Sequence, residues 1–302
     1  MVFSNANFPM TSDGRTYHVE LKRGECANRV ITVGDHARAK RMAKLFDPVP
    51  PVFEYTSHRN FYTATGRYKG VPVTVIAIGM GNALVDFFVR EVRAVVDGPM
   101  CMIRFGSCGS LKGAHVGNFI VPDSAVGIFR NYDYFLPDNE GLLPYMITKP
   151  APADSDVVAL LENELTTVFG EEKVHKGLNI NADSFYSSQG RIDENFVDHN
   201  EDLFDRIDKE LPNAVSLEME NFILYHLANC STTAPLAQKT AKKSISVGST
   251  MMVFADRASN EFIDHSIVPA LEMKGGRAVL EAIVKWQPHE DLHSDVGSVW
   301  EL

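Results

Sequence analysis

The sequence predicts a single α/β domain in which a central sheet is covered by helices, and two observations carry this prediction. Short β-branched runs alternate along the 302 residues with segments whose apolar residues recur at helical spacing. Several of the strand candidates are mainly apolar or β-branched and end at glycine, as expected of strands buried on both faces. No internal repeat or linker divides the chain.

The elements follow in order from local pattern. In the first half, strands are expected over 30–33, 61–68, 71–78, 99–105 and 116–121, with helices over 36–46 and 82–96. In the second half, helices are expected over 154–169, 201–211, 221–228 and within 261–286, with strands over 177–181, 214–217 and 244–247. Asp154 is a suitable N-cap. The stretch 129–152 shows no period and is expected to be a long loop. Residues 1–15 are interpreted as a loose leader, 16–287 as the folded domain and 288–302 as a polar tail.

Composition excludes several classes of function. The formal net charge of −10 argues against a general binder of nucleic acid or anionic membranes, which needs a basic face. No apolar run approaches the roughly 18 residues of a spanning helix, and the first residues lack a secretory pattern. The cysteines at 26, 101, 108 and 230 form no CxxC motif, so we expect free thiols in a reducing, cytoplasmic compartment.

Two short motifs are discounted. Residues 289–293 fit HExxH, but they directly follow Pro288 and lie near the C-terminus, where a solvated tail is the better interpretation. Gly79-Met80-Gly81 follows a strand and opens a helix, but the third glycine and the later acid of a dinucleotide site are absent. No serine-hydrolase elbow, P-loop or paired-cysteine zinc motif is present.

Glycine, arginine and hydroxyl residues follow several strands, and this pattern predicts an anion site. Segments 34–38, 58–60, 79–81 and 104–109 have this character. Ligands of α/β sheets bind at the carboxyl ends of strands, where backbone N–H groups and arginine can hold phosphate. Arg104 is the most informative residue because it interrupts an apolar run, where a buried charge requires a partner. A purely structural ion pair remains the alternative for Arg104.

Three segments in order resemble the hallmarks of the nucleoside phosphorylase family, whose members act on uridine and on purine nucleosides. They are 33–35 with Arg38, 103–109 and 218–220. The resemblance extends from about residue 18 to residue 283. It implies a three-layer α/β sandwich with a mixed, partly barrel-like central sheet, and it makes 16–287 a catalytic domain.

The resemblance also implies roles for individual residues. Phosphate would be bound by Gly34, Arg38, Arg104 and Ser107, together with Arg59 from a neighbouring subunit. The ribose would contact Met219, Glu220 and the helper Glu218, together with His18 from the neighbour. Sites completed in this way require a homodimer or a larger homo-oligomer. For 218–220, the residues alone, without the resemblance, would favour an acidic helix N-terminus.

The base-binding segment distinguishes the subclasses. Phe185, Gln189 and Arg191 resemble the uridine-specific version, in which a Gln-x-Arg pair reads the pyrimidine and the aromatic ring stacks on it. Asp256 falls near the acid with which purine enzymes protonate the base, and Arg257 follows it. We therefore expect uridine phosphorolysis, with Arg104, Glu220 and Arg191 as the catalytic residues. The alternatives are a purine nucleoside phosphorylase using Asp256, a nucleosidase and a non-enzymatic nucleoside-binding homologue.

No cofactor is implied, because inorganic phosphate is itself a substrate. Some bacterial relatives hold a monovalent cation with a Glu directly after the borrowed arginine. Asn60 occupies that position here, so we expect no metal site of this kind. The partners expected are a nucleoside, phosphate and further copies of the chain.

Overall fold

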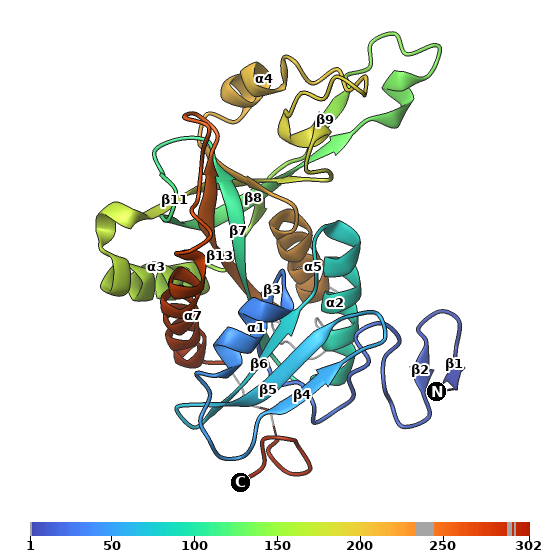
Figure 1. The fold of residues 1–302 in the computed structure, drawn as a ribbon. Coiled ribbons are helices and arrows are strands. Elements are labelled where there is room, and N and C mark those ends of the chain that lie inside the picture. The colour runs from blue at the N-terminus through green and yellow to red at the C-terminus, as the bar shows by residue number, and fades with distance from the viewer. Residues whose placement is uncertain (1, 234–244, 289–291, 293) are drawn as a thin grey trace.

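One mixed sheet of twelve strands organises the computed structural model, which describes residues 2–233, 245–288, 292 and 294–302 (Figure 1). Its strand order is β14-β13-β8-β11-β12-β7-β3-β6-β5-β4, and β9 and β10 pair with β8. The strands are β3 (Arg29–Val33), β4 (Phe53–Thr56), β5 (Tyr62–Tyr68), β6 (Val71–Ala77), β7 (Met100–Ser110), β8 (Phe119–Arg130), β9 (Tyr145–Ile147), β10 (Ala151–Pro152), β11 (Val174–Ala182), β12 (Ala214–Glu218), β13 (Ile245–Asp256) and β14 (Glu261–Phe262).

Five of these strands pair in a closed ring and form a small barrel within the sheet. β7 pairs with β12, β12 with β11, β11 with β8 and β8 with β13, and β13 returns to β7. The closing pair is parallel and extends from Ile245 opposite Met100 to Asp256 opposite Ser110. The expectation of a mixed, partly barrel-like sheet is confirmed.

Helices cover both faces of the sheet (Figure 1). One face carries α1 (His36–Ala43), α3 (Ser155–Phe169) and α7 (Val268–Lys285), and the other carries α2 (Asn82–Val95) and α5 (Asn221–Thr233). A further helix, α4 (Leu203–Glu210), lies beyond the barrel. None of the helices in the described residues is both long and apolar enough to cross a membrane.

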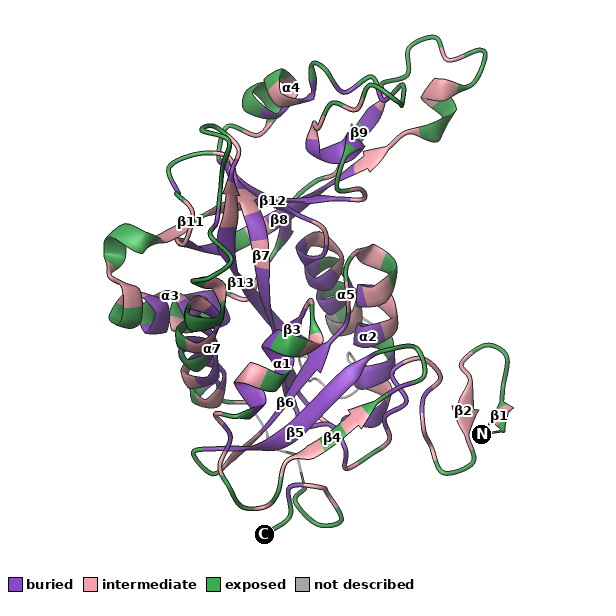
Figure 2. Ribbon diagram, viewed as in Figure 1, coloured by how far each residue is buried: buried purple, intermediate pink, exposed green. Residues whose placement is uncertain are grey.

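The alternation of side chains along β7 explains the three layers. Ile103 and Phe105 belong to the core shared with α1, α3 and α7, whereas Met100 and Met102 belong to the core shared with α2 and α5. A strand whose residues face apolar cores on both sides must be apolar throughout, and Figure 2 shows these strands buried along most of their length. The predicted three-layer fold is confirmed.

The structure corrects several predicted boundaries. β7, β8 and β13 extend well past the predicted ends at 105, 121 and 247. Their second halves contain glycine, serine and aspartate, which pairing on both sides holds in strand conformation against their low propensity. The predicted loop 129–152 includes the end of β8, a 3₁₀ turn, β9 and β10.

Two further elements differ from expectation. β4 was not predicted, although it pairs with β5. The last long helix begins at Val268 and not at Glu261, because Glu261–Phe262 pairs with the end of β13 as β14 and Pro269 lies in the first turn of α7.

Both terminal segments contact the body of the domain. Within 1–15, Phe3–Ser4 (β1) pairs with Met10–Thr11 (β2), and Arg15 makes a bidentate ion pair with Glu25. In the segment 288–302, Trp300 is buried and its carbonyl accepts a hydrogen bond from Arg67. This mainly polar tail is therefore attached to the domain through one buried aromatic residue, Trp300. The His289–His293 motif lies outside the described residues except for Leu292.

Candidate active site

A cavity of about 390 Å³ lies where β3, β6, β12 and β13 end. Of the predicted site residues, it is lined by Gly34, Arg38, Arg104, Ser107, Phe185, Gln189, Arg191, Glu218, Met219 and Glu220. It is also lined by Asp35, Gly79, Met80, Cys108, Gly109, Leu217, Phe254, Ala255 and Phe262. The predicted residues His18, Arg59, Asp256 and Arg257 do not line it. Apart from Asp256 and Arg257, the residues of this chain that were predicted to contact phosphate, ribose and base therefore share one space.

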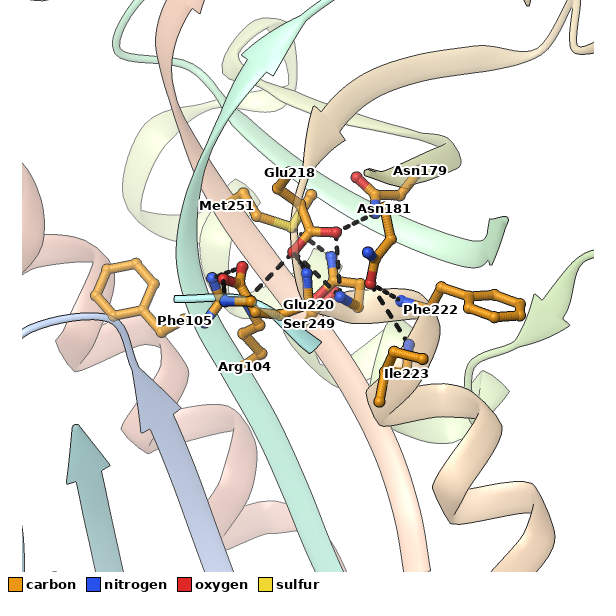
Figure 3. Close-up of polar contacts among 12 residues, drawn as sticks. Arg104, Phe105, Asn179, Asn181, Glu218, Glu220, Phe222, Ile223, Ser249 and Met251 are labelled. Carbon is orange, nitrogen blue, oxygen red and sulfur yellow. Dashed lines mark hydrogen bonds and ion pairs between the residues drawn. The ribbon is translucent and has the colours of Figure 1, made fainter. Parts of the chain in front are cut away.

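Arg104 is buried in the wall of this cavity and reaches two carboxylates (Figure 3). Its Nη2 pairs with Oε2 of Glu220, and its Nε lies 3.4 Å from Oε2 of Glu218. A Cβ on Gly106 would lie only 3.2 Å from the guanidinium carbon of Arg104, so the glycine allows the side chain to pass over the strand. The Nη1 atom has no hydrogen-bond partner among the described residues. A donor on Arg104 is therefore available to an anion.

Glu218 is fixed at the end of β12 by four hydrogen bonds (Figure 3). Its Oε1 accepts from Nδ2 of Asn179 at 2.7 Å, and its oxygens accept from the backbone N–H groups of Glu220 and Asn221. Burial and the neighbouring Glu220 carboxylate raise the pKa of Glu218, and Arg104 only partly opposes this rise. Because its oxygens hold the backbone of the next turn, Glu218 positions Glu220.

Glu220 connects Arg104 to the glycine-rich turn between β6 and α2. Its Oε1 accepts from the N–H of Gly81 at 2.6 Å, while Oε2 pairs with Arg104. Gly81 has φ of 95° and immediately precedes α2. The glycine-rich turn that a dinucleotide site would use for phosphate is therefore engaged by a carboxylate of the chain itself.

Arg38 enters the cavity from the first turn of α1. Asp35 caps this helix by accepting the Arg38 N–H at 2.9 Å. The buried Arg38 guanidinium donates from Nη1 to the carbonyl of Phe105 and from Nε to Glu272 of α7. Sequence analysis missed Glu272, whose only signal was a carboxylate among the apolar residues of a helix.

The residues predicted to read the base form a compact unit around a 3₁₀ turn, Ser187–Gln189. The Arg191 guanidinium lies 3.8 Å from the centre of the Phe185 ring, and its Nη1 donates to Oε1 of Gln189 at 2.8 Å. Gly190 closes the turn in the left-handed region, at φ of 63°. Burial and the nearby Arg257 lower the pKa of Arg191 to about 10, so it stays charged at neutral pH.

Two residues outside the cavity support this unit. Arg257 donates from Nη1 to the carbonyl of Gln189 at 3.0 Å, and its guanidinium lies over the Phe204 ring. Asn200, which sequence analysis also missed, donates to the carbonyls of Ser187 and Arg191, both at 2.9 Å. Arg257 and Asn200 donate to backbone carbonyls of the turn. The side chains of Gln189 and Arg191 therefore remain in the cavity.

Asp256 is held by its own turn. Although burial acts to raise its pKa, hydrogen bonds from the Ser259 and Ala258 N–H groups and contact with His115 lower it. This carboxylate is stabilised in its ionised form, whereas a general acid at neutral pH needs a raised pKa.

His18 and Arg59 share a surface outside the cavity. His18 stacks on Phe87 with ring centres 3.9 Å apart, and its Nδ1 lies 2.6 Å from Glu91. Arg59 is exposed, with its guanidinium 5.9 Å from the ring of Tyr17. Because His18 and Arg59 do not line the cavity of their own chain, they could contact substrate only in the cavity of another copy.

No three His, Cys, Asp or Glu side chains in the described part of the chain lie close enough together to hold a metal ion. Asn60 sits in a tight turn at φ of 68°, with its carbonyl 3.0 Å from Nε2 of His36.

Comparisons with known sequences agree with this geometry. Residues 28–239 match the model of the phosphorylase superfamily. A uridine phosphorylase of Thermococcus kodakarensis is 31% identical over 86% of this chain and 84% of its own length. A DeoD-type purine nucleoside phosphorylase of Streptococcus thermophilus is 30% identical over 82% of this chain and 94% of its own.

Solved structures share the fold. A structure from a study of two uridine phosphorylases of the oomycete Phytophthora capsici has a TM-score of 0.87 and 36% identity, covering 95% of this chain and all of that one. A nucleoside phosphorylase of Trypanosoma brucei, described as showing uridine phosphorylase activity, has a TM-score of 0.74 at 20% identity and covers 93% of this chain and all of its own. The second likeness supports the fold alone.

Proposed function

The chain belongs to the phosphorylase superfamily, and we propose that it catalyses the reversible phosphorolysis of uridine to uracil and ribose 1-phosphate. One observation carries the proposal. A single cavity joins Arg38 and Arg104, the Glu220 carboxylate and the Gln189–Arg191 pair. The similarity to uridine phosphorylases of Thermococcus kodakarensis and Phytophthora capsici supports the choice of substrate.

The reaction needs charge placed on both sides of the sugar. As the glycosidic bond breaks, the ribose gains positive charge and the base gains negative charge. Arg38 and Arg104 hold the phosphate, which attacks the anomeric carbon and stabilises the cationic sugar. Glu220 accepts hydrogen bonds from the ribose hydroxyls, and Met219 packs against the ring. No organic cofactor and no covalent enzyme intermediate take part.

The residues around the Gln189 turn recognise the base. The Gln189 side-chain amide can accept a hydrogen bond from the N–H of uracil and donate one to a carbonyl, while the Arg191 guanidinium donates to the second carbonyl. The same contacts stabilise the charge that develops on the leaving base. Phe185, which is 46% exposed, offers its ring to the base.

A purine enzyme with Asp256 as general acid is the less favoured candidate. This carboxylate does not line the cavity, and its hydrogen bonds favour the ionised form. The retained arginines similarly disfavour a nucleosidase, because attack by water needs no anion clamp.

The active enzyme is a homodimer or a larger homo-oligomer. His18 would bind the ribose 5′-hydroxyl and Arg59 the phosphate in the site of a neighbouring copy, and their shared surface outside the cavity supports this arrangement. The free thiols support a reducing, cytoplasmic location.

The reverse reaction tests the proposal. Purified protein supplied with uracil and ribose 1-phosphate should form uridine and release phosphate, whereas hypoxanthine in place of uracil should react poorly. Failure to form uridine, with inosine formed from hypoxanthine, would replace the proposal by the purine reading.

A further inference from the structure

We propose that Glu272 is the positioning residue for the phosphate-binding arginine Arg38, with Arg41 as the second cation that shares the charge of Glu272. This inference rests on the proposed function, because it assigns a role within the same phosphate site. It starts from a buried carboxylate on α7 that the reaction itself does not use. Glu272 is only 2% exposed, yet it comes from a helix whose neighbouring buried residues are apolar.

Close packing of α1 on α7 places this carboxylate within reach of Arg38. One turn beyond Glu272, a Cβ added to Gly276 would lie 3.0 Å from Cγ of Met42 on α1. A larger residue at 276 would require the Met42 side chain to move. The glycine thus permits the approach that brings the Glu272 carboxylate beside the arginines of α1.

The hydrogen bonds of Glu272 fix the orientation of the Arg38 guanidinium. Oε1 accepts from Arg38 Nε at 2.9 Å, and the carbonyl of Phe105 accepts from Nη1 at 3.1 Å. These two anchors hold the planar group from the core side. The Nη2 atom lies 3.7 Å from the half-exposed Asp35 carboxylate, and both residues line the cavity. A dianion there would take the donors that the anchors leave free.

Charge balance explains the second arginine. A lone carboxylate on Arg38 would cancel the charge that phosphate needs. Arg41 donates from Nε to Oε2 of Glu272 at 2.6 Å, so the charge of this carboxylate is shared between two arginines and does not act on Arg38 alone. The arrangement therefore orients Arg38 without setting the whole charge of Glu272 against it, while Asp35 lies on the half-exposed side of the guanidinium. A purely structural ion pair would hold the helices together but would not alter phosphate affinity.

Phosphate binding to Glu272→Gln tests the inference. In calorimetric titrations with inorganic phosphate and no nucleoside, we expect the Kd for phosphate to rise about tenfold, because a neutral amide holds the Arg38 guanidinium less firmly than the carboxylate does. Removal of the negative charge alone would lower this Kd, so a rise reports the loss of orientation. In steady-state assays the KM for phosphate should rise similarly, while the KM for uridine stays near that of the wild type. Glu164→Gln is the matched control, because Glu164 is also buried and pairs with Lys285 of α7 away from the cavity. The control should lower Tm and leave the Kd for phosphate unchanged.

Arg41→Gln decides the matter if Glu272→Gln does not fold. It leaves Glu272 facing Arg38 alone, so phosphate should bind more weakly than to the wild type. Unchanged phosphate affinity in the variant that folds, beside a lowered Tm, would overturn the inference. Wild-type protein that binds phosphate but does not cleave uridine would instead refute the proposed function. The role of Glu272 would then still be decided by the Kd for phosphate of the same variants.

Discussion

Arg104 and Glu220 are ion-paired in the wall of the cavity, although each is proposed to bind a different substrate. Both side chains are buried, so neither charge could be left without a partner at low cost. Phosphate can replace the carboxylate at Arg104 while the ribose hydroxyls replace the guanidinium at Glu220. The ion pair therefore satisfies both buried charges, and each proposed substrate would offer one of them an alternative partner.

Arg104→Ala should abolish phosphorolysis. Loss of this guanidinium removes a donor to the phosphate, for which we expect a fall in kcat/KM of about 10²–10³-fold or more. It also leaves Glu218 and Glu220 without their shared cation. Steady-state kinetics give the effect, and gel filtration with circular dichroism shows whether the variant remains folded. Activity retained by a folded variant would remove the phosphate assignment of Arg104.

The stability contribution of Glu218 should depend on pH. Burial and Glu220 raise the pKa of Glu218 from 4.5 to about 7 in the folded chain. Between these values the unfolded chain releases the proton before the folded one, so this contribution falls as the pH rises through that range and is constant above it. Gln at this position cannot titrate.

The Tm of Glu218→Gln relative to that of the wild type should therefore increase from pH 5 to about pH 8. Thermal unfolding in phosphate-free buffers at several pH values measures the difference. A difference independent of pH would show that Glu218 has no raised pKa in the folded protein.

Gln189→Ala should reduce uridine cleavage selectively. Two hydrogen bonds to the pyrimidine are lost, which predicts a fall in kcat/KM for uridine of about 10–100-fold. Any residual inosine cleavage should change much less. Asp256→Asn is the matched comparison, since Asp256 lies outside the cavity and should leave the kcat/KM for uridine close to wild type. The purine reading gains support if Asp256→Asn has the larger effect, on inosine.

His18→Ala should raise the KM for uridine. If this ring binds the ribose of a neighbouring copy, its loss removes one hydrogen bond and we expect an increase of about tenfold. Sedimentation of wild type and variant shows whether both remain oligomeric. A wild type that is monomeric and fully active would exclude a shared site.

The fold could be predicted where local pattern and tertiary packing agree. The strands 30–33 and 71–78 are apolar on both faces and end at glycine, and they were found nearly in full. The second half of β7 could not be found, because Gly106–Ser110 has low strand propensity and depends on its pairing with β13. β4 has one half-buried face and is only four residues long, which leaves little periodicity to detect.

Some of the site residues could be identified from the sequence and others could not. Arg104 could be found because a charge inside an apolar strand is conspicuous by itself. Glu272 could not be assigned a role, because its partner Arg38 is more than 200 positions away and only the packing of α7 on α1 joins them. The roles of His18 and Arg59 lie in contacts between copies and stay predictions.

Base release from uridine and from inosine, each with and without phosphate, separates the proposed phosphorolysis of uridine from every alternative. We expect uracil release from uridine that requires phosphate and yields ribose 1-phosphate, with little release from inosine. Release of uracil without phosphate, faster cleavage of inosine than of uridine, or no cleavage of either nucleoside would contradict it.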